Sequence, residues 1–256
     1  MTISNVASVI DSSSKIEFIE EISIVIVAQD LTPTMMSLDF LKFSGIISKE
    51  WELSQQPVLN PNVAQLKFTN GVSLNAQPRS ITISETLSNK QPENLVFHTV
   101  ASKYLEKLPH AEYMGFSLSP KILLPFPNSP QSPRQYITST LLGSGSWKRI
   151  GKVPVQAGIN LMYYLDRCQM TISVSEAQLQ KSSEQLTAIL FSGNFNYGVN
   201  ADSDDSNKMT QMVNFLSNWK SDLEEFRQII NQKFLDDSED RSDSIGEKSL
   251  FPGQTL

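Results

Sequence analysis

Proton transfer near neutral pH would have to use His98 or His110, because the chain has no other histidine. A Ser-His-Asp or Cys-His pair needs such a side chain beside its nucleophile. His98 falls on the polar face of an expected helix, so we interpret it as a solvated surface residue. His110 follows Pro109 in an expected loop, which permits a functional role but does not require one. We therefore assign no catalytic residue.

The single cysteine, Cys168, leaves no second thiol for a disulfide and too few for a four-thiolate or Cys2His2 zinc site. It begins an alternating apolar strand pattern, so we interpret it as a core residue and not as a nucleophile. Residues 143–146 (Gly-Ser-Gly-Ser) are rich in glycine, but they follow an expected helix and lack the lysine-serine pair of a phosphate-binding loop. We expect no cofactor.

Residues 200–207 (Asn-Ala-Asp-Ser-Asp-Asp-Ser-Asn) are rich in the oxygen ligands that suit calcium. Counted from Asp202 at EF-hand spacing, however, Asn207 stands at the glycine position and Val213 at the bidentate glutamate position. The acids and Ser206 precede a long helical pattern, where they can cap the first turn. We therefore expect helix capping here and no metal site.

The composition is that of a folded globular chain, with 39% hydrophobic and 19% charged residues. No apolar run approaches the length of a membrane helix, and residues 1–15 lack the pattern of a secretory signal, so we expect a cytoplasmic protein without a membrane partner. Residues 236–248 carry a net charge of −4, which leaves −2 of the formal −6 for the rest of the chain. That part lacks the basic excess that phosphate contacts require, so nucleic acid is a disfavoured partner.

The chain divides at residues 124–133, which hold four prolines and are typical of a stiff connector. Residues 16–123 predict an α+β half with the ferredoxin-like order βαββαβ and one additional strand. Residues 134–235 predict an antiparallel meander followed by a long helix, joined to the first half through one continuous sheet. We expect residues 1–15 to be flexible and residues 236–256 to form a disordered acidic tail.

Three local patterns define the first half. Residues 21–29 are almost continuously apolar, which predicts a central strand buried on both faces. Thr32 should cap a helix that ends near Gly45. Residues 64–76 predict a hairpin with a three-residue loop and a left-handed Gly71, because that register places the apolar residues of both strands on one face.

Two helices and a hairpin follow. Residues 94–108 predict an amphipathic helix that ends before Pro109. Residues 155–163 and 168–174 alternate in a long hairpin whose apolar residues share one face, and Gly193 marks an expected bulge in the next strand. Residues 209–234 carry apolar side chains three or four positions apart, which predicts the longest helix of the chain.

The missing catalytic set and the tail together favour a non-enzymatic interaction, regulatory or assembly protein that binds another protein. Leu250, Phe251 and Pro252 are apolar after an acidic spacer, a pattern found in short segments that dock into a groove of a partner. Trp219 lies on the stripe of the long helix, which is either core packing or a partner interface. These four residues are the partner-binding candidates.

Two other hypotheses remain open. A hydrolase or transferase would need Asp30, at a strand end, and His110 to converge in a pocket with perturbed titration. Single-stranded RNA binding would need aromatic and lysine side chains together on an open sheet face. Lys67 and Phe68 are the suggestive residues, but as strand neighbours they point to opposite faces.

Overall fold

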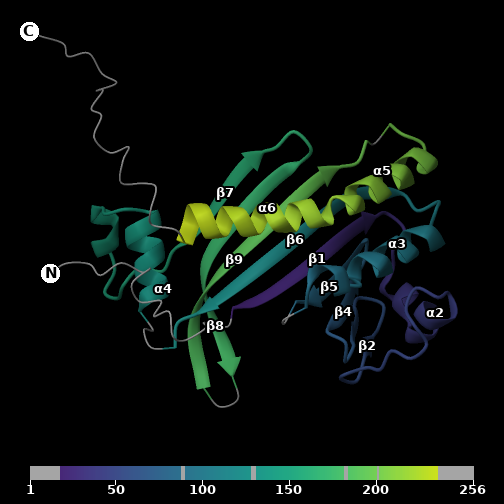
Figure 1. Cartoon of the computed structure of the whole chain (residues 1–256), viewed down its shortest axis with the longest axis horizontal. Coiled ribbons are helices and arrows are strands. Elements are labelled where there is room, and N and C mark those ends of the chain that lie inside the picture. The colour runs from purple at the N-terminus through teal and green to yellow at the C-terminus, as the bar shows by residue number, and fades with distance from the viewer. Residues whose placement is uncertain (1–17, 88–89, 128–130, 182–183, 201, 236–256) are drawn as a thin grey trace, which may run out of the picture.

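The computed structural model describes residues 18–87, 90–127, 131–181, 184–200 and 202–235. The strands are β1 (Ile19–Ala28), β2 (Val58–Leu59), β3 (Ala64–Lys67), β4 (Val72–Gln77), β5 (Ser80–Thr86), β6 (Tyr113–Pro125), β7 (Gly158–Tyr164), β8 (Gln169–Lys181) and β9 (Glu184–Gly198). They form one antiparallel sheet in the order β2-β3-β4-β5-β1-β6-β9-β8-β7 (Figure 1). The predicted mixed fold with one sheet through both halves is confirmed. The expected flexible N-terminus and acidic tail lie outside the described residues.

Helices cover one face of this sheet. The α-helices are α2 (Leu38–Phe43), α3 (Phe97–Lys107), α4 (Ser132–Gln135), α5 (Asp205–Ser217) and α6 (Trp219–Ile229). Short 3-10 segments are η1 (Pro33–Met36), η2 (Pro92–Asn94) and η4 (Ser146–Arg149), and π-helical turns are η3 (Tyr136–Leu141) and η5 (Ile230–Leu235). Helices α3, α5 and α6 lie across the middle of the sheet, against β1, β5 and β6 (Figure 1).

The sheet buries one face and leaves the other partly exposed. On β1, the side chains of Ile22, Ile24 and Ile26 are fully buried beneath the helices, whereas Val25 and Val27 on the opposite face are partly exposed. The prediction of a strand buried on both faces was therefore wrong, because no second layer of helices covers the other face in the described part of the chain. Short hydroxyl side chains dominate that face, as in the aligned pairs Ser23–Ser84, Ser23–Ser119 and Ser173–Ser192.

The two halves of the sheet repeat one arrangement of elements. The order β1-α2-β3-β4-β5-α3 in the first half matches β6-α4-β7-β8-β9-α5 in the second. From the centre of the sheet, β1-β5-β4-β3 runs outward in one direction and β6-β9-β8-β7 in the other, and the two central strands β1 and β6 are antiparallel. By this correspondence β7 is the counterpart of β3, and no strand among the described residues of the second half corresponds to β2.

The helices differ from the expected ones at their ends. The predicted helix after Thr32 is split into η1 and α2, because the side chain of Ser37 starts a new helix by accepting a hydrogen bond from the backbone N–H of Phe40. The long helix predicted over residues 209–234 is interrupted at Asn218, which separates α5 from α6. Its N-cap is Asp204, whose carboxylate accepts the N–H of Asn207 at 2.8 Å, and not Ser206.

The predicted hairpin registers are confirmed. Leu66 pairs with Leu74, the N–H of Phe68 donates to the carbonyl of Val72, and Gly71 has a φ of 88°. The bulge expected at Gly193 is absent, because Gly193 pairs with Ile172 in an unbroken β8–β9 ladder. Glycine is needed there for a different reason: an added Cβ would lie 2.8 Å from the Phe226 ring and 3.1 Å from Pro120.

Buried carboxylates hold the helices to the sheet. Glu85 of β5 accepts the N–H groups of Val96 and Phe97 at the start of α3 and pairs with Lys90. Asp222 of α6 is fully buried; it accepts two hydrogen bonds from Arg167 and one from the Tyr197 hydroxyl of β9.

Arg227 of α6 binds Glu20 of β1 in the same way, through two hydrogen bonds of 2.7 Å each. Together, these carboxylates tie α3 to β5 and tie α6 to β9 and to β1.

We predict that Gly193→Ala lowers the free energy of unfolding by about 1–3 kcal/mol, since the methyl group has to displace Phe226 in a packed core. The matched control is Gly198→Ala on the same strand, where nothing lies within 4 Å of the added Cβ, and it should change stability by less than about 0.5 kcal/mol. Urea denaturation of both variants measures the difference. Equal effects would contradict the close approach of α6 to β9.

We predict that Asp222→Ala destabilises the protein by about 3 kcal/mol, because it leaves the Tyr197 hydroxyl and part of the Arg167 guanidinium without a buried partner. Glu225→Ala removes the other carboxylate that binds Arg167, but this side chain is partly exposed, so the loss should be at most about 1 kcal/mol. Thermal or urea unfolding of the two variants compares the stability lost with the buried Arg167–Asp222 ion pair with that lost with the more exposed Arg167–Glu225 pair.

Candidate functional site

The strand β7 forms one edge of the sheet (Figure 1). It pairs with β8 from Gly158–Ser175 to Tyr164–Gln169, and within the described part of the chain no strand pairs with its other side. Seven residues of backbone therefore lie along an open edge. Such an edge offers a row of unpaired N–H and C=O groups to any extended chain that reaches it.

The direction of these backbone groups follows from the turn that joins β7 to β8. The N–H of Leu165 donates to the carbonyl of Cys168 at 2.9 Å, so Leu165 directs its backbone groups toward β8. In an antiparallel pair this direction alternates from one residue to the next. Leu161 and Tyr163 therefore bond to β8, whereas Met162 and Tyr164 direct their N–H and C=O outward. By the same alternation, Gly158 and Asn160 also direct their backbone N–H and C=O groups outward.

The edge of β7 lacks the features by which sheet edges are usually protected. Residues 153–165 contain no charged side chain, and residues 158–164 contain no proline. The side chain of Met162 is 56% exposed and that of Tyr164 is 83% exposed. At the opposite edge, β3 is covered by the two-residue strand β2, which is flanked by Pro57 and Pro61. The first half thus covers an edge position that no described strand covers in the second half.

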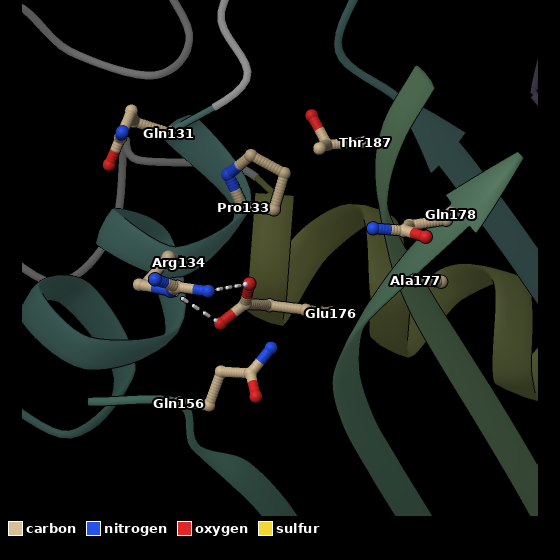
Figure 2. A pocket seen from close by; sticks show the side chains of 8 residues that line it. All are labelled: Gln131, Pro133, Arg134, Gln156, Glu176, Ala177, Gln178 and Thr187. Carbon is tan, nitrogen blue, oxygen red and sulfur yellow. Dashed lines mark hydrogen bonds and ion pairs between the residues drawn. The ribbon is translucent and has the colours of Figure 1, made fainter. Parts of the chain in front are cut away.

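A polar cavity of about 360 Å³ lies between α4 and the part of the β8–β9 hairpin near its turn (Figure 2). Arg134 of α4 forms two hydrogen bonds, of 2.9 and 3.0 Å, with the carboxylate of Glu176 on β8. Figure 2 shows Gln156 beside this pair, with Gln178 and Thr187 on the strands at the other side of the cavity. The side chains that surround the cavity therefore come from both strands of the β8–β9 hairpin, from α4 and its preceding residue Gln131, and from Gln156 before β7.

The ion pair in this cavity is already satisfied internally. The hydrogen bonds to Glu176 raise the pKa of Arg134, and the two side chains form an ion pair with each other. The hydroxyl of Thr187 is buried and has no hydrogen-bond partner among the described residues. The cavity offers amide and hydroxyl hydrogen bonds, but it contains no nucleophile with an adjacent base. The cavity can hold a small polar molecule.

The two histidines lie in different settings, and His98 is not the solvated surface residue that we expected. His98 is half-buried and stacks on Trp219, with 4.8 Å between ring centroids, and desolvation lowers the pKa of its imidazole. His110 is exposed and lines a separate cavity with Met209 and Val213 of α5. Asp30 does not line that cavity; burial raises the pKa of Tyr104 and of Tyr113, and the negative charge of Asp30 contributes in the same direction. The described structure does not bring Asp30 and His110 into one pocket.

The other sequence candidates are placed as follows. Trp219 is 6% exposed and packs edge-on against Phe97 as well as on His98, at the junction of α3 and α6. Cys168 is partly buried, and desolvation raises the pKa of its thiol, which disfavours the reactive thiolate. Leu250, Phe251 and Pro252 lie outside the described residues.

The open edge of β7 was missed by sequence reasoning. The signal was present as the uncharged run over residues 153–165, but its meaning depends on which strand ends the sheet. Among the described residues, no three His, Cys, Asp or Glu side chains are placed to hold a metal ion, and no helix there is long and apolar enough to cross a membrane. Comparison with models of protein families and with curated protein sequences finds no match.

We predict that the free energy of unfolding falls as pH decreases from 7.5 to 5.5. The folded state lowers the pKa of His98 below 6.5, so the unfolded state takes up a proton first and the stability present above that pH is lost. The slope from this group is at most about 1.4 kcal/mol per pH unit. His98→Phe should keep the contact with Trp219 and reduce the slope; urea titrations of the unaltered chain and of this variant at several pH values measure the difference.

Proposed function

We propose that the protein is a non-enzymatic interaction or assembly protein and that it binds another polypeptide along β7. The observation that carries this proposal is the uncharged edge of β7, which no strand of the described residues covers, at a position that β2 covers in the other half. An extended chain that adds to this edge would gain main-chain hydrogen bonds, and the side chains of Met162 and Tyr164 would contact it. Natural sheets rarely leave so long an apolar edge without a partner.

The binding role of the other candidates stays a proposal of lower priority. Trp219 could anchor a partner only if α3 and α6 separated, because its ring is enclosed by Phe97 and His98. The segment Leu250-Phe251-Pro252 remains a second docking segment in the proposal, supported by its apolar residues beyond an acidic spacer. A cytoplasmic location is proposed on the strength of the single cysteine.

The ferredoxin-like assignment of the first half also stays a proposal. It is supported by the order β4-β5-β1-β6, in which β5 separates the parallel strands β1 and β4. RNA binding on the open face has less support. Lys67 and Lys121 lie on this face, but Lys121 pairs with Glu21, and Phe68 is buried on the other face. The enzyme hypothesis is weakened by the separation of Asp30 from the cavity of His110.

We predict that Met162→Lys abolishes capture of the partner from the native cell, because a charge at the centre of the edge opposes pairing with an added strand. The matched control is Gln65→Lys on β3, an exposed strand position near the protected edge, which should capture as the unaltered chain does. Quantitative mass spectrometry measures the amount of partner captured by each variant relative to the unaltered chain.

A third sample, ending at Leu235, separates β7 from the tail. Loss of the partner from this sample but not from Met162→Lys would move the binding site to the tail and would contradict the role of β7. Retention by the shortened chain and loss from Met162→Lys is the result we expect.

A further inference from the structure

We infer that the chain which pairs with β7 is β7 of a second copy of this protein, antiparallel, with Leu161 opposite Leu161 of the second copy. This inference rests on the proposed function and specifies its partner. It follows from three features of β7: the positions of its outward backbone groups, the side chains that self-pairing brings together, and the charges at its two ends.

The backbone groups select one register. The outward residues are Gly158, Asn160, Met162 and Tyr164. With the symmetry axis at Leu161, Asn160 lies opposite Met162 of the second copy and Gly158 lies opposite Tyr164. All four outward residues are then in hydrogen-bonded pairs within the two strands. If the axis lay at Asn160, Tyr164 would have no residue of the other β7 opposite it. If the axis lay at Met162, Gly158 would have none.

The side chains fit the same register. On the face that β7 shares with the buried side chains of β8, the partly buried Leu161 meets its own copy, and the partly buried Ile159 meets Tyr163, whose side chain is 39% exposed. On the open face, Asn160 meets Met162, and the exposed ring of Tyr164 lies over Gly158. An aromatic side chain across from a glycine covers backbone that the glycine leaves open. No pair within the two strands places like charges opposite each other.

The charges at the ends of β7 favour the antiparallel direction. The chain that enters β7 carries Arg149 and Lys152, both exposed, and the turn that leaves it carries the exposed Asp166. Arg167 of that turn is occupied by Asp222 and Glu225. Antiparallel pairing brings the basic end of one copy toward Asp166 of the other, whereas parallel pairing would bring like ends together.

Pairing through β7 gives a closed dimer. A twofold interface uses the same strand from each copy, so the contact consumes both open edges at once. The remaining edges of the joined sheet are those at β2, which are short and flanked by Pro57 and Pro61. The assembly therefore stops at two copies and does not grow into a fibre.

Cysteine cross-linking tests the register. In a Cys168→Ser background, Leu161→Cys should form a disulfide-linked dimer under mild oxidation, because residues opposite each other at a non-hydrogen-bonded position lie within disulfide reach. Asn160→Cys is the matched control: its copy lies diagonally across, beyond the reach of a disulfide, so cross-linking should be at least about tenfold lower. Equal cross-linking of the two variants, or none with Leu161→Cys, would overturn the inference.

Sedimentation of the full chain distinguishes failure of this inference from failure of the proposed function. We expect the unaltered chain and Gln65→Lys to sediment as dimers and Met162→Lys to sediment as a folded monomer, with folding checked by circular dichroism. A monomeric unaltered chain that still loses a captured protein on Met162→Lys substitution would reject self-pairing and keep β7 as a binding edge. A Met162→Lys variant that remains dimeric would reject self-pairing through β7.

Discussion

Burial of a single face of the sheet is the constraint on which the rest of this structure depends. All helices that cross the middle of the sheet lie on the same side, and the residues beneath them form one hydrophobic core (Figure 1). Helix α6 packs so closely on β9 that Gly193 has no room for a Cβ. The polar side chains of α6 that face the sheet therefore need hydrogen-bond partners there. Asp222 and Arg227 meet that need through Arg167, Tyr197 and Glu20.

A one-sided antiparallel sheet has two edges, and the two halves of this chain treat them differently. The first half adds β2 to cover β3, and the second half adds nothing to cover β7 within the described residues. The uncharged composition of β7 would make a free edge prone to association. Pairing with a second copy converts that liability into a defined interface, which accounts for the absence of charges and prolines along the strand.

Sequence reasoning recovered the features that local pattern determines. The hairpin at Gly71 and the amphipathic helix α3 depend on neighbours a few residues apart, and both were predicted. Features set by distant contacts were not: Gly193 is required by Phe226 of α6, and His98 is half-buried because Trp219 stacks on it. The break at Asn218 interrupts a stripe that is continuous in sequence. Likewise, the uncharged run around Leu161 indicates an edge only once the strand order is known.

Amide hydrogen exchange along β7 tests the central claim most directly, because neighbouring amides report on different partners. Leu161 and Tyr163 bond to β8 and should be protected at every protein concentration. Asn160, Met162 and Tyr164 direct their N–H groups outward and should be protected at high concentration and exchange rapidly on dilution, as the second copy dissociates. Rapid exchange of the outward amides at every concentration, beside protected inward ones, would show that β7 is a solvent-exposed edge and contradict the account.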